Sequence, residues 1–271
     1  MALYTVFGGR GFIGSEIVNQ LTDSGHTVYV PKRGDGRVFK EDLGCVIYCA
    51  GHGNCNAPFD VFEANVSLLK RLLQEAKFDY LLYMSSTRVY MNQKSSNEIA
   101  SLTICGDDER RLFNLTKLLG EELCLKSKRK VCIVRPSNVY GVALNSPLFL
   151  PSITRNAITF GKVDMYIPCE YSKDYVSVQD VASCCINLAT NQNVHGEIVN
   201  IAAGYNVSAK EIADTLIKHT GCEVNWHEVK NFNERFPTTD ISKLKKYIST
   251  FSPRDVLSDL QYTIENFKKE L

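Results

Sequence analysis

Three glycines near the start of the chain have the spacing of a phosphate-binding loop. Gly8, Gly11 and Gly14, in VFGGRGFIGSEIV, lie between a predicted strand at 3–7 and a predicted helix at 12–25. Glycine at these places lets the chain turn tightly, lets the backbone approach a pyrophosphate and lets the helix pack on the strand. The helix N-terminus then holds the anion. The sequence therefore predicts a dinucleotide-binding loop rather than a purely structural turn.

Cationic residues after the second predicted strand, 26–30, indicate which dinucleotide binds. An NAD site usually has Asp or Glu at the end of this strand to hold the ribose 2′-hydroxyl. Here Lys32 and Arg33 follow instead, and Arg10 in the loop could add a further cation. Guanidinium and ammonium groups attract a 2′-phosphate. We expect NADP(H) in preference to NAD(H), with solvated loop residues as the alternative interpretation of these cations.

A second pair of residues with potential for chemistry is Phe113 and Lys117, in LFNLTKLLG. They are four residues apart on a predicted helix at 108–126, so their side chains lie on one face. A phenylalanine at the first of these positions has no proton to give.

Alternating strands and helices must position these residues. We predict strands at 3–7, 26–30, 45–50, 80–86 and 130–136, and helices at 12–25, 59–76 and 108–126. Apolar strands that alternate with helices indicate a parallel sheet covered on both faces. The expected fold class is α/β, a Rossmann-type doubly wound parallel sheet with a smaller C-terminal substrate-binding lobe.

The pattern loosens after Pro136. We predict helices at 146–161, 177–190, 208–221 and 255–270, and a strand at 196–203. Residues 1–145 are then mainly the NADP-binding Rossmann domain and residues 146–271 mainly the substrate-binding lobe. The two parts interleave in a single compact unit.

Composition excludes several classes of protein. The 271 residues carry a net charge of +1, which offers no attraction for nucleic acid or an acidic membrane. No apolar run approaches about 18 residues, and the chain begins directly with a strand, so we expect neither a membrane span nor a signal peptide. The ten cysteines include no C-x-x-C pair and no accompanying histidine cluster, so we expect no metal, reduced thiols and a cytoplasmic location.

Further motifs along the chain resemble the extended short-chain dehydrogenase/reductase family, in the branch that acts on nucleotide sugars. They are the G-x-x-G-x-x-G loop, CAGHGN, Asn65 in EANVSLLKRLL, YMSSTRVY, RPSNVYG (135–141), KDYVSVQDVA (173–182) and RFPTTDISKLKK (235–246). Their order and spacing extend the resemblance over nearly the whole chain.

The resemblance implies a site and an assembly. Together with the loop and the cations, it implies cofactor contacts from Gly8, Arg10, Gly11, Phe12, Ile13, Gly14, Lys32, Arg33, Ala50, Gly51, Lys117, Pro136 and Asn138. It implies substrate contacts from Ser86, Thr87, Asn138, Lys173 and Arg235, with a nucleotide-diphosphate sugar as substrate. The catalytic positions are Ser86, Phe113 and Lys117. Family members often pair through the helices here predicted at 59–76 and 108–126, so a homodimer is expected.

The chain departs from the family pattern at Phe113. The family uses a Tyr-x-x-x-Lys pair, in which the tyrosine gives or takes the proton on the sugar oxygen. Loss of a general acid typically costs about 10²–10⁴ in rate. Three interpretations stay open: the chain is an enzyme altered from Tyr to Phe, it is a natural protein that binds without catalysing, or Tyr90, Tyr140, Cys105 or water supplies the proton.

The residues after Ser86 bear on the reaction. Dehydratases of the family carry Asp-Glu directly after the catalytic Thr, whereas this chain has Thr87-Arg88, so dehydration is disfavoured. A compact chain with cations after strand two favours an NADPH-dependent reductase of a keto group, at C4 of a nucleotide-activated deoxysugar. The alternatives are a nucleotide-sugar epimerase and a non-catalytic protein that binds NADP or a nucleotide sugar.

Overall fold

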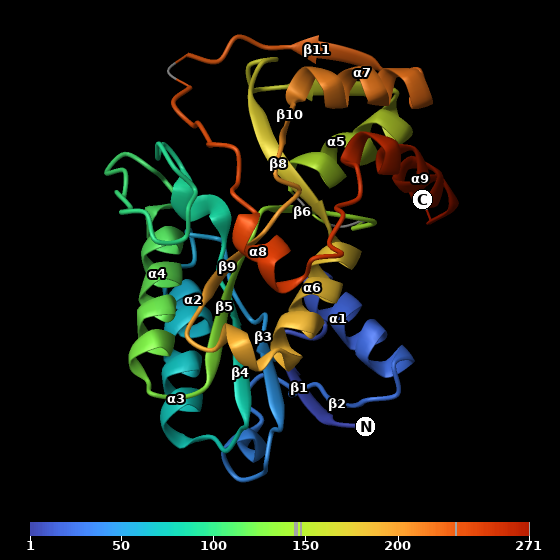
Figure 1. The fold of residues 1–271 in the computed structure, drawn as a ribbon. Coiled ribbons are helices and arrows are strands. Elements are labelled where there is room, and N and C mark those ends of the chain that lie inside the picture. The colour runs from blue at the N-terminus through green and yellow to red at the C-terminus, as the bar shows by residue number, and fades with distance from the viewer. Residues whose placement is uncertain (144–145, 147, 231, 271) are drawn as a thin grey trace.

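The computed structural model describes residues 1–143, 146, 148–230 and 232–270, and its central feature is a six-stranded sheet (Figure 1). The strand order is β2-β1-β3-β4-β5-β9, and every neighbouring pair is parallel. The strands are β1 (Leu3–Phe7), β2 (Thr27–Tyr29), β3 (Cys45–Tyr48), β4 (Tyr80–Met84), β5 (Val131–Pro136) and β9 (Ile198–Ile201). This sheet confirms the predicted Rossmann-type fold class.

Helices cover both faces of the sheet, as Figure 1 shows. One face carries α1 (Phe12–Asp23) and α6 (Val178–Thr190), and the other carries α2 (Pro58–Phe62), α3 (Leu68–Glu75) and α4 (Arg111–Lys126). Each face has its own apolar core. Ile17 and Leu21 of α1 are fully buried in the first core, and Leu69 and Leu72 of α3 in the second. Strands that are apolar on both sides therefore pack as the sequence pattern predicts.

A second lobe lies beyond the carboxyl ends of the strands. Its sheets are β10-β8-β6 and β11-β7, and its helices are α5, α7 and α9 around a third apolar core. The bounds are β6 (Asn138–Tyr140), α5 (Phe149–Phe160), β7 (Lys162–Met165), β8 (Ser172–Ser177), β10 (Asn206–Ser208), α7 (Ala209–Thr220), β11 (Glu223–Trp226) and α9 (Val256–Glu270). The short helix α8 (Ser242–Tyr247) returns to pack on β9.

The observed elements differ from the expected ones in several places, and one of the differences is helix α8, which was not predicted. The segment predicted as one helix at 59–76 is α2, a π-helical turn at Glu63–Ser67, and α3. The short strands β6, β7, β8, β10 and β11 were not predicted. The helix predicted from residue 146 begins at Phe149, and residue 145, the expected boundary between the two parts, lies outside the described residues.

Within the described residues, no helix is both long and apolar enough to traverse a lipid bilayer. In the same part of the chain, no three His, Cys, Asp or Glu side chains gather where they could hold a metal ion. All ten cysteines are free thiols.

Candidate active site

A pocket of about 430 Å³ opens at the carboxyl ends of β1, β3, β4 and β5, under the second lobe. In open parallel sheets, ligands bind at this edge, where the strand order reverses. The pocket brings together most of the residues predicted from sequence, namely Gly8, Gly11, Phe12, Ile13, Gly14, Gly51, Ser86, Thr87, Phe113, Lys117, Pro136, Asn138 and Lys173. The predicted residues Arg10, Lys32, Arg33, Ala50 and Arg235 are not among its lining residues.

The glycine loop is tight enough to exclude side chains. Gly8 has φ +77°, and a Cβ there would lie 2.7 Å from the carbonyl carbon of Cys49. A Cβ on Gly14 would clash with the carbonyl oxygen of Gly8. Helix α1 follows directly, with Gly11 as its N-cap and no side-chain cap. Its first backbone N–H groups are therefore open to an anion, so the loop fits a pyrophosphate.

The segment after β2 carries the cations Lys32 and Arg33. The Arg10 guanidinium reaches the carbonyl oxygens of Val30 and Pro31 at 3.5 Å, so it lies beside the segment that carries Lys32 and Arg33. The first carboxylate after this strand is Asp35, which accepts hydrogen bonds from Tyr29 and Arg37. These bonds hold the pKa of Asp35 well below its usual range.

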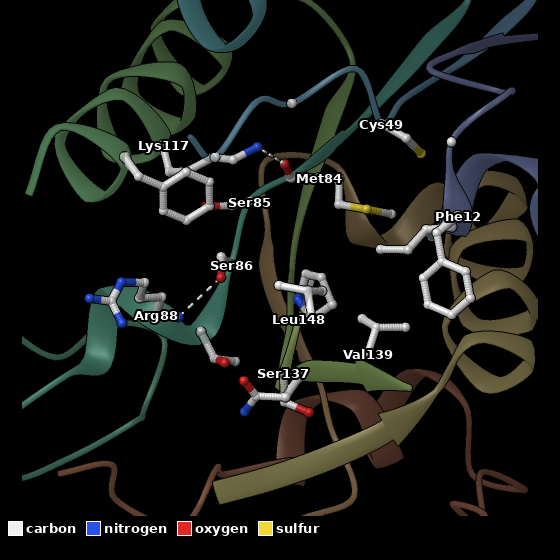
Figure 2. A pocket seen from close by; sticks show the side chains of 18 of the residues that line it. Phe12, Cys49, Met84, Ser85, Ser86, Arg88, Lys117, Ser137, Val139 and Leu148 are labelled. Atoms are coloured by element: carbon white, nitrogen blue, oxygen red, sulfur yellow. Dashed lines mark hydrogen bonds between the residues drawn. The ribbon is translucent and has the colours of Figure 1, made fainter. Parts of the chain in front are cut away.

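Lys117 is buried at the floor of the pocket. Its Nζ donates to the carbonyl oxygen of Met84 at 2.8 Å, and the side chain is 5% exposed (Figure 2). A Cβ on Gly51 would lie 2.6 Å from this Nζ, so a glycine there leaves room for the ammonium group. Burial lowers the pKa of Lys117 to about 8, although the nearby Cys49 and Glu121 act in the opposite direction.

Asn65 fixes the segment that follows β3. Its side chain is fully buried in the π-helical turn. The amide accepts from the backbone N–H of His52 at 3.0 Å, and it donates to the carbonyl of His52 at 3.1 Å and to the Thr116 hydroxyl at 3.0 Å. The π-helical turn therefore connects the segment after β3 with helix α4, at Thr116, the residue before Lys117. Such π-helical insertions are frequent at functional sites.

Two adjacent serines at the end of β4 have different surroundings. The Ser85 hydroxyl donates to the buried carboxylate of Glu121, which also pairs with Arg135. The Ser86 Oγ accepts from the backbone N–H of Arg88 at 3.1 Å, and its own proton remains for a ligand. Figure 2 shows Lys117, Ser86 and Arg88 along one side of the pocket, and Phe12 and Val139 along the other.

Phe113 lines the pocket as a ring without a hydroxyl. It lies near Gly53, and its ring centroid is 5.7 Å from the Lys117 Nζ. The three side chains considered as substitute proton donors, Tyr90, Tyr140 and Cys105, all lie outside the lining residues. Burial raises the pKa of Tyr90 to about 12, and it raises the pKa of Tyr140 further, so both phenols are weakened as acids.

Several lining residues were not predicted as ligand contacts. They are Cys49, His52, Gly53, Met84, Ser85, Arg88, Arg110, Ser137, Val139, Leu148 and Phe236. Arg88 could have been predicted as a lining residue, because it directly follows Ser86 and Thr87 in the sequence. For Arg110, Leu148 and Phe236 no local pattern distinguishes them, because long-range packing brings them to the pocket.

A glycine loop at the reversal point of a parallel sheet, in one pocket with a buried lysine and a serine, is typical of dinucleotide-binding α/β proteins. The model of the NAD dependent epimerase/dehydratase family matches residues 4–202. The chain belongs to this family.

The relatives have a range of named activities. The chain is 25% identical over 300 residues to a putative GDP-L-fucose synthase 2 of Arabidopsis thaliana, covering 96% of this chain and 91% of the relative. The solved structure of MoeE5 with UDP-glucuronic acid and NAD has a TM-score of 0.83, is 21% identical, and is matched over 99% of this chain and 100% of that one. A Tyr-to-Phe mutant of UDP-glucuronic acid 4-epimerase from Bacillus cereus, solved with a fluorinated sugar nucleotide and NAD, has a TM-score of 0.84 at 18% identity, over 99% of each chain.

Proposed function

We propose that this chain binds NADPH and a nucleotide-diphosphate sugar, and that its reaction is reduction of a keto group, at C4 of a deoxysugar. The observation that carries the proposal is that the glycine loop, Ser86 and Lys117 line one pocket. The substrate class is supported by the solved structures of similar fold, which hold nucleotide-diphosphate sugars.

The residues of this pocket have separable roles in that reaction. NADPH supplies the hydride. Ser86 donates its free proton in a hydrogen bond to the keto oxygen, and Lys117 binds the nicotinamide ribose. The oxyanion that forms needs a proton, and Phe113 cannot give one. Binding therefore remains intact in this chain while proton delivery is left to water, and turnover is slow.

The cofactor preference follows from charge at the end of β2. Arg10 lies beside the segment that carries Lys32 and Arg33, and Asp35 is already occupied by Tyr29 and Arg37. This arrangement attracts a 2′-phosphate and offers no free carboxylate to a 2′-hydroxyl. The contrary observation is that MoeE5 and the Bacillus epimerase were solved with NAD. An epimerase that recycles bound NAD is therefore the second candidate function, and a non-catalytic binding protein is the third.

The substitution Phe113→Tyr tests the proposal. It restores a phenol four residues before Lys117, and we expect NADPH oxidation to rise by about 10²–10⁴ with a 4-keto nucleotide sugar. The measurement is the loss of NADPH absorbance at saturating substrate, over a panel of nucleoside bases. Phe160→Tyr is the matched control, because Phe160 is 73% exposed in the second lobe and should leave the rate unchanged.

The other outcomes identify the competing functions. Interconversion of sugar epimers without net loss of NADPH would replace the reductase by the epimerase. Binding of both ligands with no conversion by the Phe113→Tyr variant would favour the binding protein.

A homodimer is part of the proposal. Exposed apolar side chains lie on α2 and α4, which pack against each other: Phe59 is 88% exposed, Phe62 49%, Leu115 47% and Leu119 44%. Large apolar surfaces of this kind mark protein contacts.

The free cysteines are in keeping with the predicted reducing, cytoplasmic location.

A further inference from the structure

Three cations from distant parts of the chain line one side of the pocket. Arg88 follows β4, Arg110 precedes α4 and Lys173 lies on β8. Two of these residues contact the catalytic positions, Arg88 through its backbone and Arg110 through its side chain. The backbone N–H of Arg88 donates to the Ser86 Oγ, and the Arg110 guanidinium carbon is 5.0 Å from the centre of the Phe113 ring.

Two carboxylates hold these cations from outside the pocket lining. Asp108 accepts from the Arg88 guanidinium at 2.7 Å, from the Arg110 backbone N–H at 2.9 Å and from Asn114 at 2.8 Å. Glu234 lies 3.2 Å from Arg88 and 3.5 Å from Lys173. Neither carboxylate is a lining residue, so each aims its cations without blocking the space in front of them. The five groups carry three positive and two negative charges, which leaves one positive charge facing the pocket.

The uncompensated cation is Arg110. Among the described residues, no carboxylate lies within ion-pair distance of its guanidinium. Arg110 is exposed and lines the pocket, so its guanidinium is accessible to an anionic ligand that enters there. The Nε of Arg88, whose residue is 8% exposed, also lacks a hydrogen-bond partner.

We propose that Arg88, Arg110 and Lys173 form a site for a carboxylate on the sugar of the nucleotide-sugar substrate. This proposal rests on the proposed function and specifies the sugar of the substrate. The carbon that lacks a hydroxyl in that deoxysugar is then a different carbon from the one that bears the carboxylate. The residual charge of one matches a carboxylate, whereas a diphosphate carries about two negative charges. Position decides between the two in the same way. Phe113 flanks the reacting carbon, so the Arg110 guanidinium beside its ring faces the sugar rather than its diphosphate.

Matched pairs of sugar nucleotides test this site by titration calorimetry. The pairs are UDP-glucuronic acid with UDP-glucose, and GDP-mannuronic acid with GDP-mannose, with UDP and GDP alone as further arms. In at least one pair we expect the acidic sugar to bind about tenfold or more tightly than the neutral one. Arg110→Gln should abolish that advantage, and Lys173→Met should reduce it. Arg88 is left in place, because its removal would strand the buried Asp108 charge.

The matched control is Arg111→Gln, which removes the adjacent arginine outside the pocket lining and should keep the advantage. Equal affinity for acidic and neutral sugars in both pairs, including the absence of binding, overturns the proposal. So does an advantage that survives Arg110→Gln, or an equal weakening of UDP or GDP alone, which would assign the cations to the diphosphate. This experiment measures binding and not turnover. An inactive Phe113→Tyr variant would therefore contradict the proposed reaction but would leave the preference for acidic sugars unaffected.

Discussion

At the scale of single residues, the site depends most on the protonation state of Lys117. It is buried beside Met84 and Gly51, and burial lowers its pKa to about 8. The ammonium form is therefore the main species at neutral pH, and the neutral amine takes over as pH rises through about 8. A bound nicotinamide ribose that accepts a hydrogen bond from the ammonium group stabilises the charged form, because hydrogen bonding to the charged form raises the pKa of an amine.

The affinity for NADPH should consequently fall as the pH rises from about 7 to about 9, by up to about tenfold per pH unit above the Lys117 pKa. The measurement is titration calorimetry across this range. The Lys117→Met variant should bind more weakly at every pH and lose the step near pH 8. A step of the same size in that variant would show that another group titrates.

The sequence was sufficient for the residues that act through local geometry. The three glycines and the Phe113–Lys117 pair are defined by spacing within one loop and one helix, and both line the pocket. Arg110 and Glu234 carry no local signal, since their roles depend on β4, β8 and the segment after β11 meeting at one place. Arg235 shows the same limit, because it is exposed and lies outside the lining residues, while its neighbour Phe236 lines the pocket.

At the scale of elements, the π-helical turn at Glu63–Ser67 sets the geometry between β3 and α4. Asn65 at its centre satisfies the backbone of His52 and the hydroxyl of Thr116. Asn65→Ala would leave buried polar groups unpaired, each at about 1–3 kcal/mol. We expect a loss of about 2–4 kcal/mol in the free energy of unfolding and weaker NADPH binding. Urea unfolding and calorimetry provide the two readouts.

Asn187→Ala, on the exposed surface of α6, is the matched control and should change little. If Asn65→Ala costs no more than this control and leaves NADPH affinity unchanged, the turn has no positioning role.

The sequence pattern predicted the limits of some helices and strands better than those of others. Helices α4, α7 and α9 have sustained apolar periodicity, and α7 has a capping box between Ser208 and Glu211, so their limits are within a few residues of the expected ones. Strands β6, β10 and β11 have only three or four residues, too few to show alternation. The π-helical turn inserts into an otherwise regular helix pattern, and nothing in its sequence marks the insertion.

At the scale of the whole molecule, the apolar surface of α2 and α4 is the proposed contact between two copies. Leu119→Glu would place a charge in a desolvated interface, so the dimer should dissociate at micromolar concentration. Sedimentation velocity measures the outcome. Ile217→Glu is the matched control, since Ile217 is 43% exposed, close to the 44% of Leu119, but lies on α7 in the second lobe. A wild-type monomer, or a variant that dimerises as before, would contradict the assignment.

The account depends most on the dinucleotide site, and binding tests it without requiring turnover. Calorimetric titration of the unmodified chain with NADPH and with NADH should give one site per chain, with NADPH the tighter ligand. Gly8→Val should abolish the signal, because its side chain would meet the Cys49 carbonyl where φ is +77°. Association of neither coenzyme with the unmodified chain would contradict the central claim, and tighter binding of NADH would contradict the role given to the cations after β2.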